Sequence, residues 1–161
     1  MAQDADWELM QACHVADDGG LGRACRAVAA GADVGRLQAG YSPLYQAARC
    51  NSVRTCEMLI KKGAAVGQRM QHGAVALHGA CHGNNLEVAR LLAANGADVG
   101  AAANDGTTPL HLACKADHTE LAGFLLSKGA NPCCFRDDGV TPLMLACSQG
   151  RLVRVYKLQR I

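Results

Sequence analysis

The chain has little aromatic content: one Trp, three Tyr and two Phe among 161 residues. Half of the residues are nevertheless apolar, so the core must be built mainly from Ala, Leu, Val and Cys, which suits thin, closely packed helices. No apolar run approaches the roughly 18 residues of a membrane-spanning helix, and no long basic run accompanies the net charge of +2. We therefore expect neither a membrane nor a nucleic acid as a partner. The first ten residues, MAQDADWELM, lack a secretory signal, which predicts a cytoplasmic or nuclear protein.

One sequence pattern returns every thirty-three residues. TTPLHLAC from Thr107 recurs as VTPLMLAC from Val140, and weaker copies are YSPLYQAA from Tyr41 and VALHGAC from Val75. Leucines and glycines keep the same spacing: Leu44, Leu77, Leu110 and Leu143; Gly40, Gly73, Gly106 and Gly139; Gly63, Gly96 and Gly129. A fixed period of roughly 20–50 residues indicates one supersecondary unit stacked on copies of itself.

Each copy has the signals of two short helices. Ser42 and Thr108 supply N-cap oxygens, and the prolines after them fit a first helical turn, where no N–H donor is needed. The break between the two helices is expected at a residue type that tolerates positive φ: Asn51, Asn84, Asp117 or Gly150. A second helix follows and ends at a glycine. The expected fold is an all-α solenoid of helix–turn–helix–loop units.

This unit, with TPLH, GAD and DG at these places, resembles the ankyrin repeat family, and the resemblance covers nearly the whole chain. We expect a single domain over residues 1–161 with about four and a half repeats. The copies are expected at residues 4–34, 35–66, 67–99, 100–132 and 133–161. The resemblance implies an array that binds partners on its concave face, and it does not identify the partner.

The two ends depart from the pattern. The first copy has three extra residues around Asp17 to Gly20, which are expected to lengthen its helix turn. Its Asp4, Asp6 and Glu8 suit an exposed N-terminal cap. The fifth copy stops within its second helix. Its residues Leu152, Val155 and Leu158 form an apolar stripe, which lies beside four basic residues. We expect a monomer, with weak self-association through this helix as the alternative.

Cysteine and histidine suggest other chemistry, which the repeat mostly explains. His78 and His82 stand at i, i+4, a spacing of metal ligands, but no fourth ligand is near in the pattern. The resemblance instead gives His78 the task of bonding neighbouring loops. Four of the nine cysteines hold the same repeat position and are expected to be reduced core residues: Cys13, Cys81, Cys114 and Cys147. Cys133 and Cys134 form a vicinal pair in an exposed turn, for which a redox role is the alternative.

The positions that the repeat leaves free form the candidate binding surface. The resemblance places them on the concave face: Tyr41, Arg49, His72, His82, Asn104, Asp105, Lys115, Asp137, Asp138, Ser148 and Gln149. Tyr and Arg are residue types that often anchor interfaces. The alternative is that these are only solvated loop residues. Glu87 and Arg90, in the second helix of the third copy, are expected to face away from this surface.

The expected function is non-catalytic binding of a protein or peptide through the concave face, with no metal and no cofactor. Two alternatives stay open. Short arrays of this kind resemble inhibitors of cyclin-dependent kinases in length and repeat count, although no residue signature supports that role. The chain could also be the targeting module of a larger complex such as a ubiquitin ligase, which no second domain supports.

Overall fold

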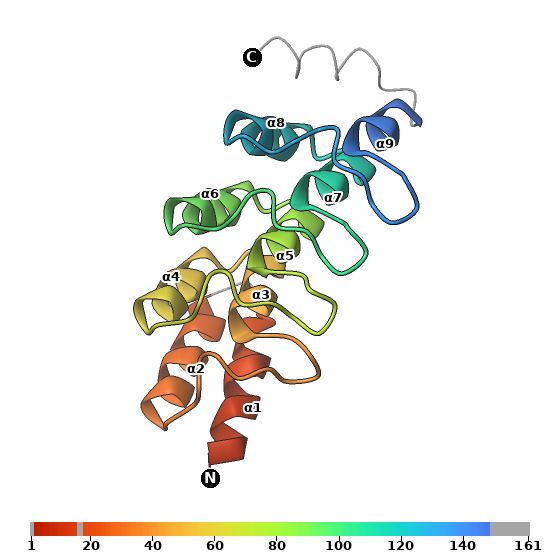
Figure 1. Cartoon of the computed structure of the whole chain (residues 1–161). Helices are drawn as coiled ribbons and strands as arrows, with labels where there is room; N and C mark the ends of the chain where they lie inside the picture. The colour runs from red at the N-terminus through yellow and green to blue at the C-terminus, as the bar shows by residue number, and fades with distance from the viewer. Residues whose placement is uncertain (1, 16–17, 149–161) are drawn as a thin grey trace.

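The computed structural model describes residues 2–15 and 18–148, and these residues form nine helices and no strand. The helices run in pairs along the chain (Figure 1). They are α1 (Ala2–Cys13), α2 (Asp18–Ala29), α3 (Pro43–Arg49), α4 (Val53–Lys61), α5 (Ala76–His82), α6 (Leu86–Ala94), α7 (Pro109–Lys115), α8 (Thr119–Ser127) and α9 (Pro142–Ser148). The all-α repeat fold predicted from the sequence is confirmed.

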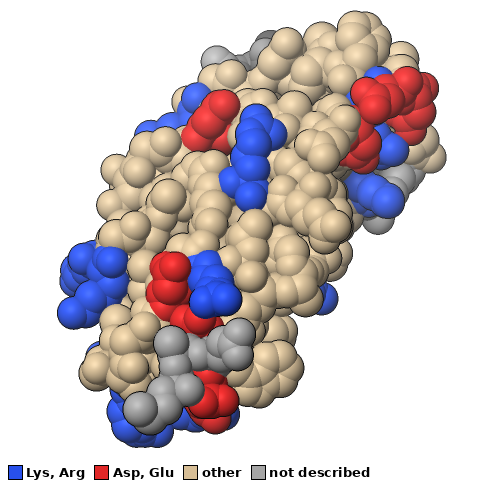
Figure 2. Space-filling view, turned by 60° about the horizontal axis from the view of Figure 1, so that its bottom comes forward, with Lys and Arg blue, Asp and Glu red and all other residues tan. Residues whose placement is uncertain are grey.

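The pairs stack into an elongated array of two layers. Helices α1, α3, α5, α7 and α9 form an inner layer, and α2, α4, α6 and α8 form an outer layer. The loops between pairs project beside the inner layer (Figure 1). Loops and inner helices together border one long face, which we call the concave face. The surface seen in Figure 2 is mostly uncharged, with acidic and basic side chains in small groups.

Local signals in the sequence explain where these helices begin and end. The Ser42 hydroxyl accepts the Tyr45 N–H at 3.1 Å, and the following proline occupies the first turn of α3. The breaks inside three pairs have positive φ, as predicted: 59° at Asn51, 57° at Asn84 and 61° at Asp117. Gly150, expected at the fourth break, lies outside the described residues. Each pair can therefore reverse direction within three or four residues.

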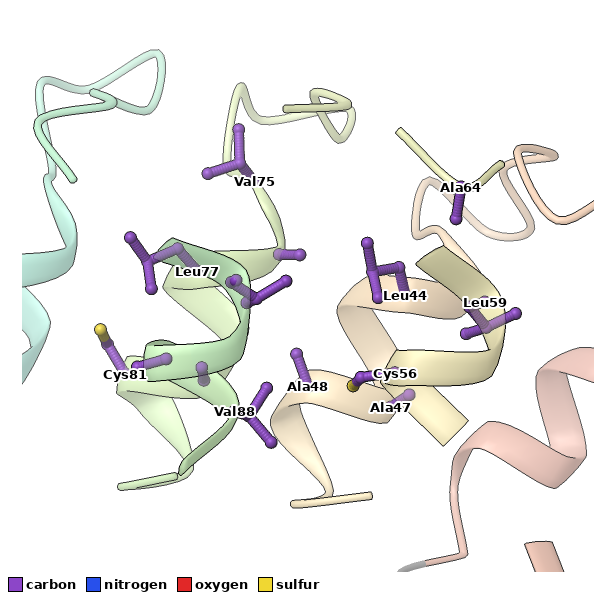
Figure 3. Packing of buried hydrophobic residues seen from close by; sticks show 14 of the residues in the cluster. Leu44, Ala47, Ala48, Cys56, Leu59, Ala64, Val75, Leu77, Cys81 and Val88 are labelled. Atoms are coloured by element: carbon purple, nitrogen blue, oxygen red, sulfur yellow. The ribbon is translucent and has the colours of Figure 1, made fainter. Parts of the chain in front are cut away.

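Small side chains and leucines fill the core between the layers (Figure 3). Leu44, Leu77 and Leu110 are at most 1% exposed, as their repeat position predicts. The helices approach so closely that a Cβ on Gly79 would lie 2.8 Å from the carbonyl oxygen of Tyr45. The inner layer thus depends on alanine and glycine for its spacing, and Leu143, in the last described helix, is only half-buried.

The predicted core role of the repeat cysteines is confirmed for two positions and wrong in degree for two. Cys13 and Cys81 are fully buried, whereas Cys114 and Cys147 are half-buried. Cys147 lies in α9, the last described helix, and Cys114 of α7 is partly buried against the core. Cys56 of the outer layer is also fully buried, which its place outside the common repeat position did not predict.

The N-terminal pair differs from its expected form in two ways. Asp6 is not an exposed cap residue: it is 4% exposed, accepts the Asp33 N–H at 2.7 Å and lies 3.2 Å from the Arg36 guanidinium. The extra residues extend a helix rather than a turn, because α2 already begins at Asp18. Gly20 lies against α1, where a Cβ would meet the Ala12 carbonyl oxygen at 2.8 Å.

The described residues test the prediction about the membrane but do not include the C-terminal apolar stripe. The apolar stripe of Leu152, Val155 and Leu158 lies outside the described residues, together with its basic neighbours. Across the parts that are described, no helix has the length and apolar character needed to cross a bilayer.

Candidate functional site

Main-chain hydrogen bonds join the projecting loops to one another. Each loop donates an N–H to a carbonyl of the loop before it: Gln71 to Gly40 at 3.2 Å, Asn104 to His72 at 2.9 Å and Asp137 to Asp105 at 3.1 Å. The loops touch closely, since a Cβ on Gly106 would lie 2.9 Å from the Arg136 Cα atom. This stacking holds the loop side chains in a row along one edge of the concave face.

The first of these loops closes differently from the others. Gln38 and Tyr41 pair as an isolated antiparallel bridge around Ala39 and Gly40, which both have positive φ. Such a two-residue turn needs positive φ at both central positions, which alanine adopts at a cost. The sequence contained no signal for this turn, because Ala39 is an unusual residue there.

Two buried histidines tie the inner helices to the loops, as the resemblance implied. His78 is 2% exposed; its Nδ1 accepts the Val75 N–H at 3.2 Å, and its Nε2 donates to the Thr107 carbonyl at 3.0 Å. His111 repeats this arrangement with Thr108 and Val140 at 3.1 Å each. Burial, opposed by the carbonyl hydrogen bond, lowers the pKa of both rings. Both histidines are therefore neutral structural residues at pH 7.

A groove of about 480 Å³ lies on the concave face between the second and third loops and the inner helices. Five of the predicted binding residues line it: His72, His82, Asn104, Asp105 and Lys115. Other lining residues were not among the predicted binding residues: Tyr45, His78, His111, Leu112 and Arg136. Tyr45, His78 and His111 occupy the same repeat position, which the sequence pattern assigned to packing. Nothing in the sequence indicated that they would also line a groove.

Aromatic rings form the N-terminal side of this groove. The Tyr41 ring lies 5.2 Å from the Tyr45 ring and 5.8 Å from the His72 ring, and its hydroxyl lies 3.4 Å from His72 Nε2. Burial, followed by the nearby Tyr41, raises the pKa of Tyr45. Tyr41 is half-buried within this cluster, so only part of its ring is accessible to a partner.

The predicted loop carboxylates also hold the loops themselves. Asp105 accepts the Thr107 N–H at 3.0 Å and its hydroxyl at 2.8 Å, and these two bonds lower the pKa of Asp105. Asp138 accepts the Val140 N–H at 3.1 Å and pairs with Arg136 at 2.9 Å. Structural roles therefore explain much of why carboxylates stand at these two positions.

The other predicted residues lie at different places on the face. Arg49, His82 and Lys115 are exposed at the ends of α3, α5 and α7. Asp137 is exposed in the last described loop, and the exposed Ser148 donates its hydroxyl to the Leu145 carbonyl at 3.0 Å. Gln149 lies outside the described residues.

Glu87 and Arg90 lie in the outer layer, away from the groove, as predicted. They are not inert, however. The Arg90 guanidinium stacks 4.9 Å from the centre of the Phe124 ring and lies 4.0 Å from the Glu87 carboxylate. A substitution of Arg90 would therefore disturb packing as well as surface charge.

The thiols and histidines show no assembled reactive centre in residues 2–15 and 18–148. Within that part, no group of three or more His, Cys, Asp or Glu residues is placed to hold a metal ion. All nine cysteines are free, and burial raises the pKa of Cys13 and Cys56 to about 12. Of the vicinal pair, Cys133 is exposed as expected, but Cys134 is half-buried, with its sulfur 3.1 Å from the Asn131 carbonyl.

Comparison with known proteins agrees with this architecture. A family model described as ankyrin repeats (3 copies) matches residues 9–103 and again residues 99–158. Among curated proteins, no sequence matches this chain.

Proposed function

The chain belongs to the ankyrin-repeat family, and from this we propose that it is a non-catalytic module that binds a protein or peptide through its concave face. Ankyrin repeats are in general protein–protein interaction modules. We further propose that the array acts as a monomer in the cytoplasm or nucleus.

The groove beside the loops is the observation that carries this proposal. It brings together five exposed side chains from two loops and two inner helices. Its wall combines an aromatic cluster with isolated cationic and amide groups, a mixture typical of recognition surfaces.

Co-purification with the tagged full chain tests the proposal. Tyr41→Ala with Arg49→Ala should weaken binding of the captured partner by about 2 kcal/mol, as interface anchors do. The control is Glu57→Ala with Lys61→Ala, two exposed residues of the outer helix α4, which should leave affinity within about 0.5 kcal/mol. Equal loss from both pairs would place the partner elsewhere.

Thermal melts are needed beside this comparison, because Tyr41 packs on Tyr45 and His72. Loss of binding counts only if the variant unfolds near the temperature of the unaltered chain. The identity of the captured protein separates the alternatives: a cyclin-dependent kinase would favour an inhibitor, and a ligase subunit would favour a targeting module.

A further inference from the structure

Three consecutive helices of the inner layer carry charge of one sign only. The sequences of α3, α5 and α7 are PLYQAAR, ALHGACH and PLHLACK, without a single carboxylate. Each ends in a basic residue at the same repeat position: Arg49, His82 and Lys115. All three are exposed. They form a stripe of hydrogen-bond donors along the floor of the concave face, which we call the basic stripe.

Helix stability alone does not account for this stripe. A cation in the last turn stabilises any helix through the helix dipole. Such a cation is not present in every helix of this chain: in the outer layer α2 and α4 have Arg26 and Lys61 in their last turns, whereas α6 and α8 have no basic residue there. In the inner layer α1 and α9 also lack one, and a basic residue recurs only at the three consecutive steps from α3 to α7. The basic stripe is therefore a feature of the middle of the concave face, and helix ends in this chain do not require it.

Two carboxylates of the loop row, those of Asp105 and Asp138, make contacts within their own loops. Both oxygens of Asp105 accept hydrogen bonds from Thr107, and Asp138 pairs with Arg136. These contacts keep the two acidic groups in the loop row, at the edge of the face, while the basic stripe runs along its floor.

We propose that the basic stripe binds an extended acidic segment of a partner protein, in the polyproline II conformation, with a carboxylate at every third residue. Helices packed side by side lie about 8–10 Å apart. A polyproline II chain has three residues per turn and rises about 3.1 Å per residue, so residues i, i+3 and i+6 share one side at about 9 Å intervals. A β-strand does not match, because its residues i and i+3 point to opposite sides. This inference rests on the proposed function and specifies the partner's chemistry.

The aromatic cluster supports the same conformation. Segments in polyproline II conformation dock in grooves lined by aromatic rings. The Tyr45 ring lines the groove, with Tyr41 stacked on it at 5.2 Å. Proline or alanine residues between the carboxylates can pack on these rings while the carboxylates reach the basic stripe.

Three labelled nonapeptides test this inference by fluorescence anisotropy with the full chain. The first is (Asp-Pro-Ala)3, the second has the same composition with the three Asp residues adjacent, and the third is (Lys-Pro-Ala)3. We expect the first to bind about tenfold more tightly than the second, a difference of about 1.4 kcal/mol. Its affinity should fall as salt is raised, and the third should not bind.

Matched variants test the site. Arg49→Glu with Lys115→Glu should lower affinity for the first peptide at least tenfold, and Arg49→Gln with Lys115→Gln serves if the reversed pair does not fold. Lys61→Glu with Lys128→Glu makes the same charge change on exposed residues of the outer layer and should change affinity less than twofold.

Three results would overturn the inference: equal binding of the two acidic peptides, no binding of either, or equal loss from the outer-layer variant. Each of these results leaves the proposed function intact if the double variant Tyr41→Ala with Arg49→Ala still loses a protein that co-purifies with the unaltered chain. If that double variant instead kept its partner, the proposed function itself would fail, because the concave face would not be the binding site.

Discussion

The stability of the array should fall in mildly acidic solution, because His78 and His111 must stay neutral in the folded state. In each ring Nδ1 accepts a backbone N–H and Nε2 donates to a carbonyl of the next loop. Protonation would place a proton on Nδ1, facing the N–H that it now accepts. One hydrogen bond would be lost, and a charge would be buried without a partner.

The lowered pKa of both rings determines how the free energy of unfolding changes with pH, and over which pH range. Above the unfolded-state pKa of about 6.5, neither state binds the proton and stability is unaffected. Below it, the unfolded chain binds protons that the folded chain refuses, so the free energy of unfolding falls with pH. The slope is at most about 1.4 kcal/mol per pH unit for each histidine, or about 2.7 kcal/mol for the two, until the folded-state pKa is reached.

Urea denaturation at pH 7.5, 6.5 and 5.5 measures this slope. His78→Gln should destabilise the array by about 1–3 kcal/mol at pH 7.5, because it breaks a buried bond between repeats. It should also remove its share of the slope below pH 6.5. His72→Gln, at an exposed histidine, serves as the control. Flat stability over this range, or an unchanged slope in His78→Gln, would refute the reasoning.

Other predictions test the core. Leu110→Ala should cost about 2–5 kcal/mol in a denaturant melt as a new cavity, and a loss below about 1 kcal/mol would place Leu110 outside the core. Gly79→Ala should destabilise by about 1–3 kcal/mol although alanine normally favours a helix, because its Cβ would press on the Tyr45 carbonyl; a stabilised variant would show that α3 and α5 are farther apart. A thiol reagent should modify the exposed Cys25 and Cys133 first and reach the fully buried cysteines only on unfolding, whereas uniform rapid reaction in the native protein would contradict the packing.

The period of the sequence predicted most of the fold because the repeat constrains the backbone strongly. Proline, an N-cap hydroxyl and a residue tolerant of positive φ recur at one spacing, and each has a single structural use. The places of Leu110 in the core and of Asn84 in a helix break therefore follow from the sequence alone. The burial of Asp6 was missed because its partner, the Asp33 N–H, lies 27 residues away, where no local pattern points.

The candidate site was less predictable, since a repeat position shows where a side chain lies but not what it contacts. Asp105 and Lys115, which the sequence predicted on the concave face, line the groove, and their role in binding stays a prediction. The bonds between Asp105 and Thr107 are local, yet nothing in the sequence showed that they would occupy both carboxylate oxygens. Arg136 was missed because its role at the groove depends on the loop stacking, which is a property of neighbouring repeats.

The main-chain bonds between loops allow the residues of the loop row to vary. The main-chain joints use N–H and C=O groups, so they do not depend on the side chain of the donor residue. Side chains such as those of Arg69 and Asn104 add further bonds to a neighbouring loop. Within this one chain the donor is Gln71, Asn104 or Asp137 in turn, and each makes a main-chain bond to the loop before it. A library randomised at these positions should retain the fold while sampling new partners, which makes the loop row a natural substrate for selection and for engineering.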